Sequence, residues 1–132
     1  MKDEKFDCLI HCAGAYATDD EDLVASYKKI METNFRSVVD VIDIAKKTWL
    51  REGGNIIVFG STCAGYGRKN ISLYSASKSA INSFVEAYNS RLLEQNIKIN
   101  VIAPAKVQGK LQQMINPKAD QSKMIYPRRL AE

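Results

Sequence analysis

The chain has 132 residues, of which 45% are hydrophobic and 26% charged, and its formal net charge is +4. This length and composition are typical of one folded globular domain and exclude a disordered or fibrous chain. No stretch reaches the roughly 18 consecutive apolar residues of a membrane span, and no secretory signal follows the charged opening at 1–5, so we expect a cytoplasmic protein without a membrane segment.

The first third of the chain predicts a strand and a helix. Residues 6–14 form a short apolar run closed by a glycine, which predicts a buried strand. Residues 18–21, Thr-Asp-Asp-Glu, offer an N-cap and acidic first-turn residues for a helix. Leu23, Tyr27 and Ile30 then recur at helical spacing.

A second helix is expected to follow closely. Its apolar residues run from Phe35 to Trp49, and it is expected to end near Gly53 and Gly54. The apolar stripe is wide, so it must be buried on more than one side. We expect a sheet on one side and another subunit on the other.

The remaining elements complete an alternating pattern. Residues 55–59 predict a strand, 60–67 a turn-rich loop, 72–95 a long helix and 97–103 a strand that ends at Pro104. A short helix near 108–115 and irregular chain to 132 are expected after it. Strands that alternate with helices predict an α/β fold, here a parallel sheet of about three strands with flanking helices in one domain over 1–132.

The cysteines, the histidine and the basic residues argue against other classes of site. Cys8, Cys12 and Cys63 are odd in number and lack paired C-x-x-C spacing, and His11 is the only histidine. We therefore expect no disulfide framework, no metal site and buried reduced thiols. Basic residues are spread along the chain, so nucleic-acid binding is not expected.

Tyr74 and Lys78 are the residues with the clearest chemistry. They lie four positions apart in the helix expected at 72–95 and so share a face. A nearby cation favours the phenolate and lowers the pKa of a tyrosine, which suits proton transfer near neutral pH. The loop that begins at Gly60 and Ser61 precedes this helix, at the strand end where open α/β sheets place ligands.

At these residues the sequence resembles the short-chain dehydrogenase/reductase family, non-extended branch, and the resemblance covers essentially the whole chain. The matching stretches, in chain order, are Asp7–Gly14, Asn34 in Glu32–Phe35, Gly54–Ser61, Tyr74–Lys78 and Ile99–Val107. Ser61 precedes Tyr74 by 13 positions, the family's usual interval. Thr62 is the alternative to Ser61 as the catalytic hydroxyl.

The resemblance implies a Rossmann-like, doubly wound fold and a catalytic set of Asn34, Ser61, Tyr74 and Lys78. Tyr74 would be the general acid or base of a hydride transfer between a carbonyl and an alcohol. Lys78 would lower the pKa of Tyr74 and hydrogen-bond the nicotinamide ribose. Ser61 would donate to the substrate oxygen, and Asn34 would hold a water in a proton relay to Lys78.

The resemblance also implies a cofactor, NAD or NADP, and subunits that pair through the two long helices as a homodimer or homotetramer. The substrate would be a small carbonyl compound or alcohol. The expected cofactor contacts are Ala13, Gly14, Tyr74, Lys78, Pro104, Ala105 and Val107.

Four residues depart from the family pattern. His11 and Cys12 replace two asparagines, Ala105 replaces a glycine, and Gly109 replaces a threonine that contacts the cofactor. We expect the cofactor contacts there to be weaker or differently made.

The family's phosphate-binding glycine cluster has no counterpart in this sequence, because Gly65 and Gly67 belong to the serine loop. We therefore expect a fragment, the catalytic C-terminal half of a Rossmann-type domain. Its first strand would be an unpaired edge. The chain alone would bind NAD(H) or NADP(H) poorly and turn over little.

Two alternatives remain open from the residues. The first is a non-catalytic remnant that keeps the fold for dimerisation or binding, which the wide apolar helix stripes would suit. The second is the extended, sugar-nucleotide-modifying branch of the superfamily, which has parallels to residues 33–37. That branch usually lacks the pattern found at 100–104, so we favour the non-extended branch.

Overall fold

A computed structural model of the protein describes residues 5–20 and 22–132, apart from the side chains of Trp49 and Arg51. The charged opening at 1–4 and Glu21 of the predicted helix start lie outside the described residues, as does the side chain of Trp49 at the end of the predicted apolar stripe.

The sheet has three parallel strands in the order β1 (Phe6–His11), β2 (Leu50–Phe59) and β3 (Lys98–Ile102). The predicted α/β class and parallel sheet are confirmed. β2 starts earlier than predicted because Leu50 pairs with Phe6, before a register shift brings Asn55 opposite Cys8. The prediction that the preceding helix ends near Gly53 and Gly54 is therefore wrong.

The two helices predicted in the first half form one helical rod. It consists of α1 (Leu23–Ile30), the π-helical turns η1 (Met31–Arg36), α2 (Ser37–Ile44) and the π-helical turns η2 (Ala45–Trp49). The residues at the junctions keep right-handed helical dihedral angles. No glycine or proline lies between 23 and 49 to interrupt the rod.

The rod begins later than predicted because its N-cap is Asp22. The Asp22 carboxylate accepts the N–H groups of Val24 and Ala25, each at 2.9 Å. The prediction of an N-cap within residues 18–21 is wrong. Aspartate is a strong cap because its carboxylate accepts free N–H groups of the first turn and its negative charge is favourable at a helix N-terminus.

The second half contains α3 (Ser72–Leu93) and α4 (Lys110–Ile115). Short 3₁₀ turns occur at η3 (Thr62–Ala64), η4 (Gln121–Lys123) and η5 (Pro127–Leu130). α3 was predicted almost to its ends. None of the helices in the described ranges is long and apolar enough to cross a bilayer.

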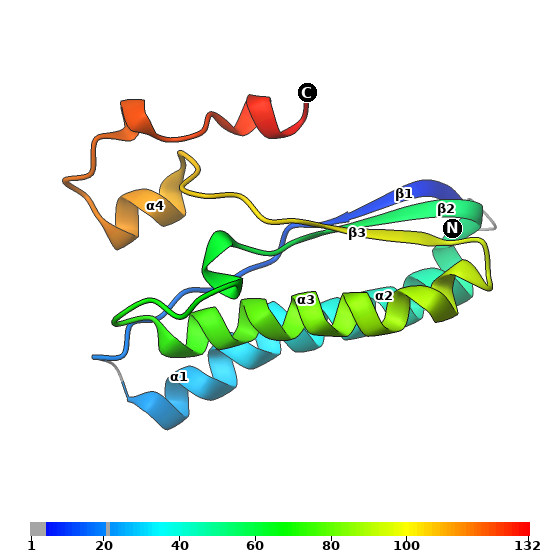
Figure 1. The fold of residues 1–132 in the computed structure, drawn as a ribbon, viewed down its shortest axis with the longest axis horizontal. Helices are drawn as coiled ribbons and strands as arrows, with labels where there is room; N and C mark the ends of the chain where they lie inside the picture. Colours follow the sequence, from blue (N-terminus) through cyan, green and yellow to red (C-terminus); the bar gives the residue numbers. More distant parts are fainter. Residues whose placement is uncertain (1–4, 21) are drawn as a thin grey trace.

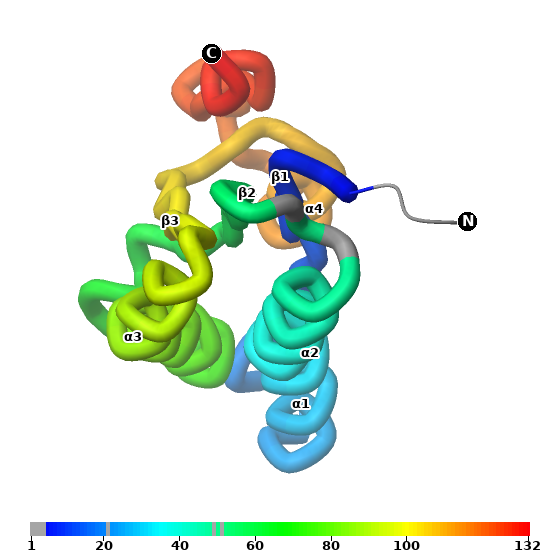
Figure 2. The backbone as a smooth tube through the Cα atoms, turned by 90° about the vertical axis from the view of Figure 1, so that its right-hand side faces the viewer, coloured from blue at the N-terminus to red at the C-terminus, as the bar shows by residue number. Residues whose placement is uncertain are grey.

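The helices α1, α2 and α3 lie on one face of the sheet, and the C-terminal segment with α4 lies near the carboxyl ends of the strands (Figures 1 and 2). The core fills the space between these helices and the sheet. Its fully buried members include Ile42 on α2, Ile56 and Val58 on β2, and Ile81 on α3. Burial of these side chains is the main stabilisation of the two layers.

β1 is less buried than predicted. Phe6 is 54% and Ile10 59% exposed, because β1 is an edge strand and the helices cover only one face of the sheet. The prediction of buried thiols is wrong for Cys8 and Cys12, which are exposed, and right for Cys63.

Candidate active site

A cleft of about 840 Å³ lies at the carboxyl ends of the strands. Segments far apart in the sequence line it: the chain after β1, the loop after β2, the first turns of α3, the chain after β3, and the C-terminal segment. All the expected cofactor contacts line this cleft, namely Ala13, Gly14, Tyr74, Lys78, Pro104, Ala105 and Val107. Ser61 lines it too, whereas Asn34 does not.

Lys78 is held inside the protein rather than at its surface. It is 4% exposed, and its Nζ donates to the carbonyl oxygen of Phe59 at 2.8 Å. The same Nζ lies 5.8 Å from the centre of the Tyr74 ring. Burial lowers the pKa of Lys78 below its ordinary value. An ammonium has three hydrogens, so two remain for other acceptors.

The pKa of Tyr74 is raised, not lowered as predicted. Burial of the phenol is the largest cause, the Cys63 thiol adds to it, and a hydrogen bond with Ser61 acts in the opposite direction. The Lys78 ammonium bonds to a backbone carbonyl and lies near the ring, so it does not offset the desolvation of the phenolate. Tyr74 is therefore protonated at neutral pH, the form that a general acid needs.

The hydroxyl groups of Ser61 and Thr62 have different partners. The Ser61 hydroxyl acts on the Tyr74 phenol and opposes the rise of its pKa, and the Ser61 Oγ accepts from the Cys63 backbone N–H at 3.3 Å and from the Cys63 thiol at 3.1 Å. The Thr62 Oγ1 instead accepts from Arg68 at 3.3 Å. Of the two candidates, Ser61 is the hydroxyl that meets the phenol. The contact between Ser61 and Cys63 was not predicted from the sequence.

Close packing fixes the residue that precedes Ser61. A Cβ atom on Gly60 would lie 2.7 Å from Cγ1 of Val101, closer than side chains can approach. The Gly60 N–H donates to the carbonyl oxygen of Ile102 at 2.8 Å. Glycine therefore lets the end of β2 stay against β3 and sets where Ser61 leaves the sheet.

Asn34 is fully buried in η1, beneath the cleft wall. Its Oδ1 accepts the Ala15 N–H at 2.6 Å, and its Nδ2 donates to the Ala15 carbonyl at 3.0 Å and to Ser77 Oγ at 2.9 Å. Both amide hydrogens are used, so the side chain has none left for the water that was expected there. The side chain instead fastens the chain after β1 to α3.

Asp19 makes a second link between the same two segments. Its carboxylate accepts the Ser72 N–H at 2.8 Å and the Ser72 hydroxyl at 2.7 Å. Asp19 thus satisfies the first turn of α3, although the sequence pattern assigned it to the first helix. Only the tertiary structure brings these two residues together.

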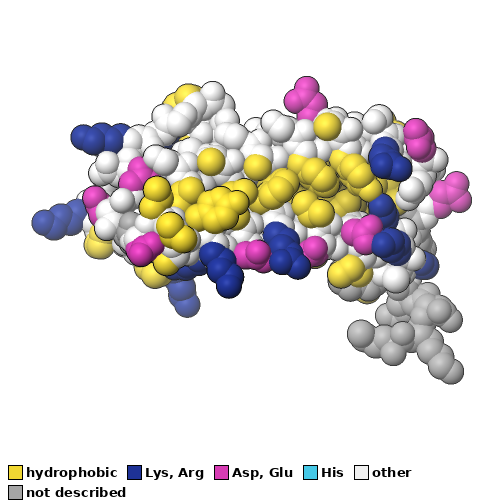
Figure 3. Space-filling model, turned by 90° about the horizontal axis from the view of Figure 1, so that it is seen from below, with side chains coloured by type: hydrophobic (Ala, Val, Ile, Leu, Met, Phe, Trp, Pro, Cys, Tyr) yellow, Lys and Arg dark blue, Asp and Glu magenta, His cyan; other side chains and the backbone are white. Residues whose placement is uncertain are grey.

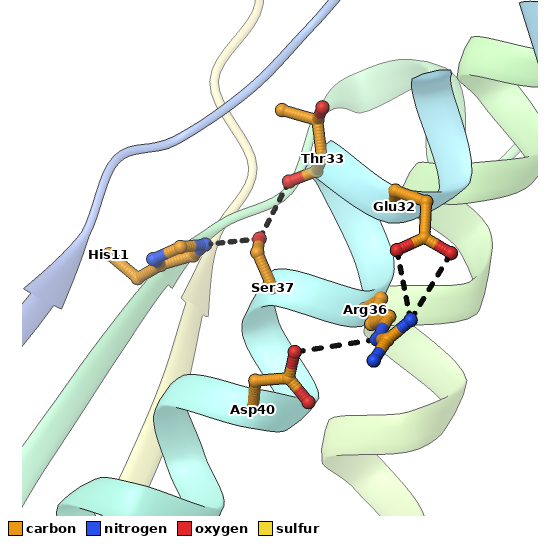
Figure 4. A network of polar contacts seen from close by, with 6 residues as sticks. All are labelled: His11, Glu32, Thr33, Arg36, Ser37 and Asp40. Atoms are coloured by element: carbon orange, nitrogen blue, oxygen red, sulfur yellow. Dashed lines mark hydrogen bonds and ion pairs between the residues drawn. The ribbon is translucent and has the colours of Figure 1, made fainter. Parts of the chain in front are cut away.

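His11 stands where the family has an asparagine, and it connects β1 to α2 (Figure 4). The Ser37 hydroxyl donates to the Thr33 carbonyl at 2.6 Å, so its oxygen accepts from Nε2 of His11, 2.9 Å away. A hydroxyl has one hydrogen, which assigns the imidazole proton to Nε2. The pKa of His11 is lowered, first by burial and then by the charge of Lys78.

This shift predicts a pH dependence of stability. The unfolded chain binds the proton with the ordinary pKa of 6.5, and the folded chain binds it less readily. The stability contributed by neutral His11 is therefore complete above that value and is lost as the pH falls through the lower folded pKa. We expect the urea midpoint to fall more steeply between about pH 6.5 and 5 in the wild type than in His11→Gln. If the urea midpoint fell equally steeply with pH in the wild type and in His11→Gln, the prediction would be contradicted.

The other departures lie further along the cleft. Gly109 has φ +154°, a conformation that side-chain-bearing residues rarely adopt, so the family's threonine would be strained here. Ala105 lines the cleft. The backbone conformation at position 109 therefore suits the glycine of this chain better than the threonine of the family.

Comparison with known proteins identifies relatives along nearly the full chain. A sequence profile for short chain dehydrogenases matches residues 2–120. The chain is 27% identical over 128 residues to the 2-dehydro-3-deoxy-D-gluconate 5-dehydrogenase of Dickeya dadantii (strain 3937). This alignment covers 94% of the present chain and 51% of the dehydrogenase.

Two solved structures share the fold. A dehydrogenase/reductase from Sinorhizobium meliloti 1021 has a TM-score of 0.79 and 27% identity, over 96% of this chain and 54% of its own. A blue fluorescent protein from a metagenomic library, in complex with NADPH, has a TM-score of 0.73 and 30% identity, over 80% of this chain and 43% of its own. The chain spans about half the length of these relatives.

Proposed function

Because this chain belongs to the short chain dehydrogenase family, we propose that it is the catalytic half of an NAD(P)-dependent oxidoreductase that interconverts a carbonyl compound and an alcohol. In this proposal residues 1–132 are one incomplete Rossmann-type domain. The observation that carries it is the meeting of Ser61, Tyr74 and Lys78 in one cleft.

The side chains divide the proton chemistry between them. A nicotinamide cofactor would supply or accept the hydride. Tyr74, protonated at neutral pH, gives its phenolic hydrogen to the carbonyl oxygen as negative charge develops there. Ser61 donates a hydrogen bond to the same oxygen. Lys78 has two hydrogens left for the ribose hydroxyls of the cofactor.

The assay is the oxidation of NADPH or NADH, at millimolar cofactor, in the presence of a panel of carbonyl compounds. A rate that depends on Tyr74 supports the proposal. A rate that is the same in Tyr74→Phe would overturn it.

The cleft suits the nicotinamide half of a cofactor, since residues from the ends of β1 and β3 and from α3 line it together. The solved relative that binds NADPH supports the same class of cofactor. The pyrophosphate half normally sits on a glycine-rich helix N-terminus, and this sequence offers no such glycine cluster.

We therefore expect the 132-residue chain to bind both cofactors weakly. Isothermal titration of the purified chain with NADH and NADPH should give dissociation constants of about a millimolar, since only part of the usual contacts is available. Micromolar binding of either cofactor would contradict this, and the tighter of the two would then identify the natural one.

We also propose that the protein is a homodimer or homotetramer that associates through its helix layer. A band of hydrophobic side chains runs along this face between charged groups (Figure 3). Phe35 packs edge-on against Phe84 at 5.8 Å between ring centres, and Phe84 stacks on Tyr88 at 5.2 Å. Exposed apolar residues of the same helices are Leu23, Val24, Tyr27, Ile44 and Leu93. An apolar surface of this extent is typical of an interface.

Sedimentation equilibrium should therefore give a mass of two or four times the 14.8 kDa of one chain. Ile44→Asp, on the helix face, should shift the protein toward the monomer. Leu111→Asp is the matched control, because Leu111 is similarly exposed on α4. A monomer at all concentrations, or equal effects of the two variants, would contradict the proposal.

The alternative function, a non-catalytic protein that keeps the fold for dimerisation, rests on the same helix face. An oligomer without any Tyr74-dependent rate would favour it. Ser61, Tyr74 and Lys78 would then have no reason to share a cleft.

We also propose that the protein is cytoplasmic, since its free thiols Cys8, Cys12 and Cys63 suit a reducing compartment.

A further inference from the structure

The charge of the cleft lining is uniformly positive. Its basic side chains are Arg68, Lys78, Lys106, Lys110 and Lys123, and none of the aspartates or glutamates in the ranges 5–20 and 22–132 lines it. Lys123 lies 3.8 Å from Asp120, and Lys78 is buried against Phe59. Asp19 lies near Tyr16 of the cleft, but its carboxylate accepts two hydrogen bonds from Ser72. Three cations of the cleft, Arg68, Lys106 and Lys110, have no carboxylate partner among the described residues.

Arg68 differs from the two lysines because its guanidinium is held in place. Its Nη2 donates to the Tyr66 hydroxyl at 2.9 Å and to Thr62 Oγ1 at 3.3 Å. Its Cζ lies 5.3 Å from the centre of the Tyr66 ring, within the range of a cation–π contact. These contacts between exposed side chains favour one position of the guanidinium beside the cleft.

The contact with Thr62 also sets where the charge lies. Thr62 follows Ser61 directly in the loop, so the guanidinium contacts the residue next to the one whose hydroxyl is expected to meet the reacting oxygen. Both hydrogens of Nη2 are used, which leaves the hydrogens of Nε and Nη1 for an anion. Hydrogen bonds from guanidinium to carboxylate or phosphate are among the strongest that proteins make.

We propose that Arg68 binds an anionic group of the substrate, a carboxylate or a phosphate, that lies beside the reacting carbonyl or alcohol. The position of this group relative to the reaction rests on the proposed function, whereas the anion site itself does not. Lys106 and Lys110 add positive potential along the cleft and favour the approach of anions.

The test is a binding titration that needs no turnover. Benzoate and its neutral analogue benzamide are titrated into the full chain in low salt by calorimetry, followed by inorganic phosphate and adenosine 2′,5′-bisphosphate. Each titration is repeated with R68Q, R68K and R91Q. Arg91 is an exposed arginine on α3 outside the cleft lining, so R91Q loses the same charge and serves as the matched control.

We expect benzoate to bind more tightly than benzamide, and R68Q to weaken benzoate binding by about tenfold or more. R91Q should bind like the wild type, and R68K should fall between. Tighter binding of phosphate than of benzoate, lost in R68Q, would support the site and assign it to a phosphate group.

Three results would overturn the proposal. Benzamide could bind as tightly as benzoate, R68Q could keep the wild-type affinity for anions, or only the adenosine bisphosphate could depend on Arg68, which would make it a cofactor contact. A protein that binds benzoate through Arg68 but reduces no carbonyl would overturn the proposed function alone. A protein that reduces carbonyls without preferring anions would overturn this inference alone.

Discussion

Tyr74→Phe is expected to lower the rate of carbonyl reduction by about 10²–10⁴-fold, the usual contribution of a general acid. The substitution removes only the phenolic oxygen. The ring keeps its contact with Tyr16, whose centre lies 5.3 Å away. The fold and the cofactor affinity should therefore change little, and the loss should appear in kcat. Steady-state kinetics together with a urea denaturation curve separate the two effects.

Tyr27→Phe is the matched control for this variant. Tyr27 is 55% exposed on α1, outside the cleft lining, so its hydroxyl should be dispensable for activity. A Tyr74→Phe enzyme with more than about a tenth of the wild-type rate would remove Tyr74 from the role of general acid.

The raised pKa of Tyr74 also predicts how the two directions depend on pH. Reduction needs the phenol, which is already present at neutral pH, so its rate should be nearly constant there. Alcohol oxidation needs the phenolate, so its rate should rise with pH into the alkaline range. This rise of the oxidation rate with pH should disappear in the Tyr74→Phe variant.

Asn34→Ala is expected to destabilise the fold by about 3 kcal/mol, because it opens a gap at a fully buried position and removes three hydrogen bonds to half-buried or buried groups. The Ala15 N–H and carbonyl and the Ser77 hydroxyl all hydrogen-bond the Asn34 amide, which is fully buried. The chain after β1 would lose its link to α3, so the cleft should lose order as well. Urea denaturation measures the change in the free energy of unfolding.

Asn89→Ala on α3 is the control, since Asn89 is only half-buried and no hydrogen bond of its side chain is found in the described part of the chain. Its effect should be within about 0.5 kcal/mol. Asn34→Asp keeps an acceptor for the Ala15 N–H but loses both donors and buries a charge, so it should be at least as damaging as the alanine variant. A mild effect of both Asn34 variants would show that the three bonds contribute little.

The sequence determined the local elements and their order. The continuous apolar runs at 55–59 and 97–103 and the helical spacing after 72 were sufficient, because period and length alone distinguish these elements. The spacing of Tyr74 and Lys78 placed both on one face of α3, since residues four apart on a helix are neighbours. The strand-end loop with Ser61 was predictable because parallel strands deliver their carboxyl ends to a common edge.

The sequence did not determine which groups these residues meet, because long-range contacts carry no local pattern. The exposure of β1 depends on how many layers cover the sheet, and the end of the helical rod at Trp49 depends on the pairing of Leu50 with Phe6. Asp19 was expected among the acidic residues at the start of the first helix, yet it bonds Ser72, 53 residues away.

The same limit applies to the chemistry of the site. Four-residue spacing predicted that Lys78 would lower the pKa of Tyr74, and the structure raises it, because desolvation depends on everything packed around the phenol. The relay role of Asn34 stays a prediction, because both hydrogens of its buried amide bond Ala15 and Ser77 and only its oxygen could accept from a water. The sequence thus identified the residues, and the tertiary structure decided their partners and protonation, since both depend on burial and on contacts between distant segments.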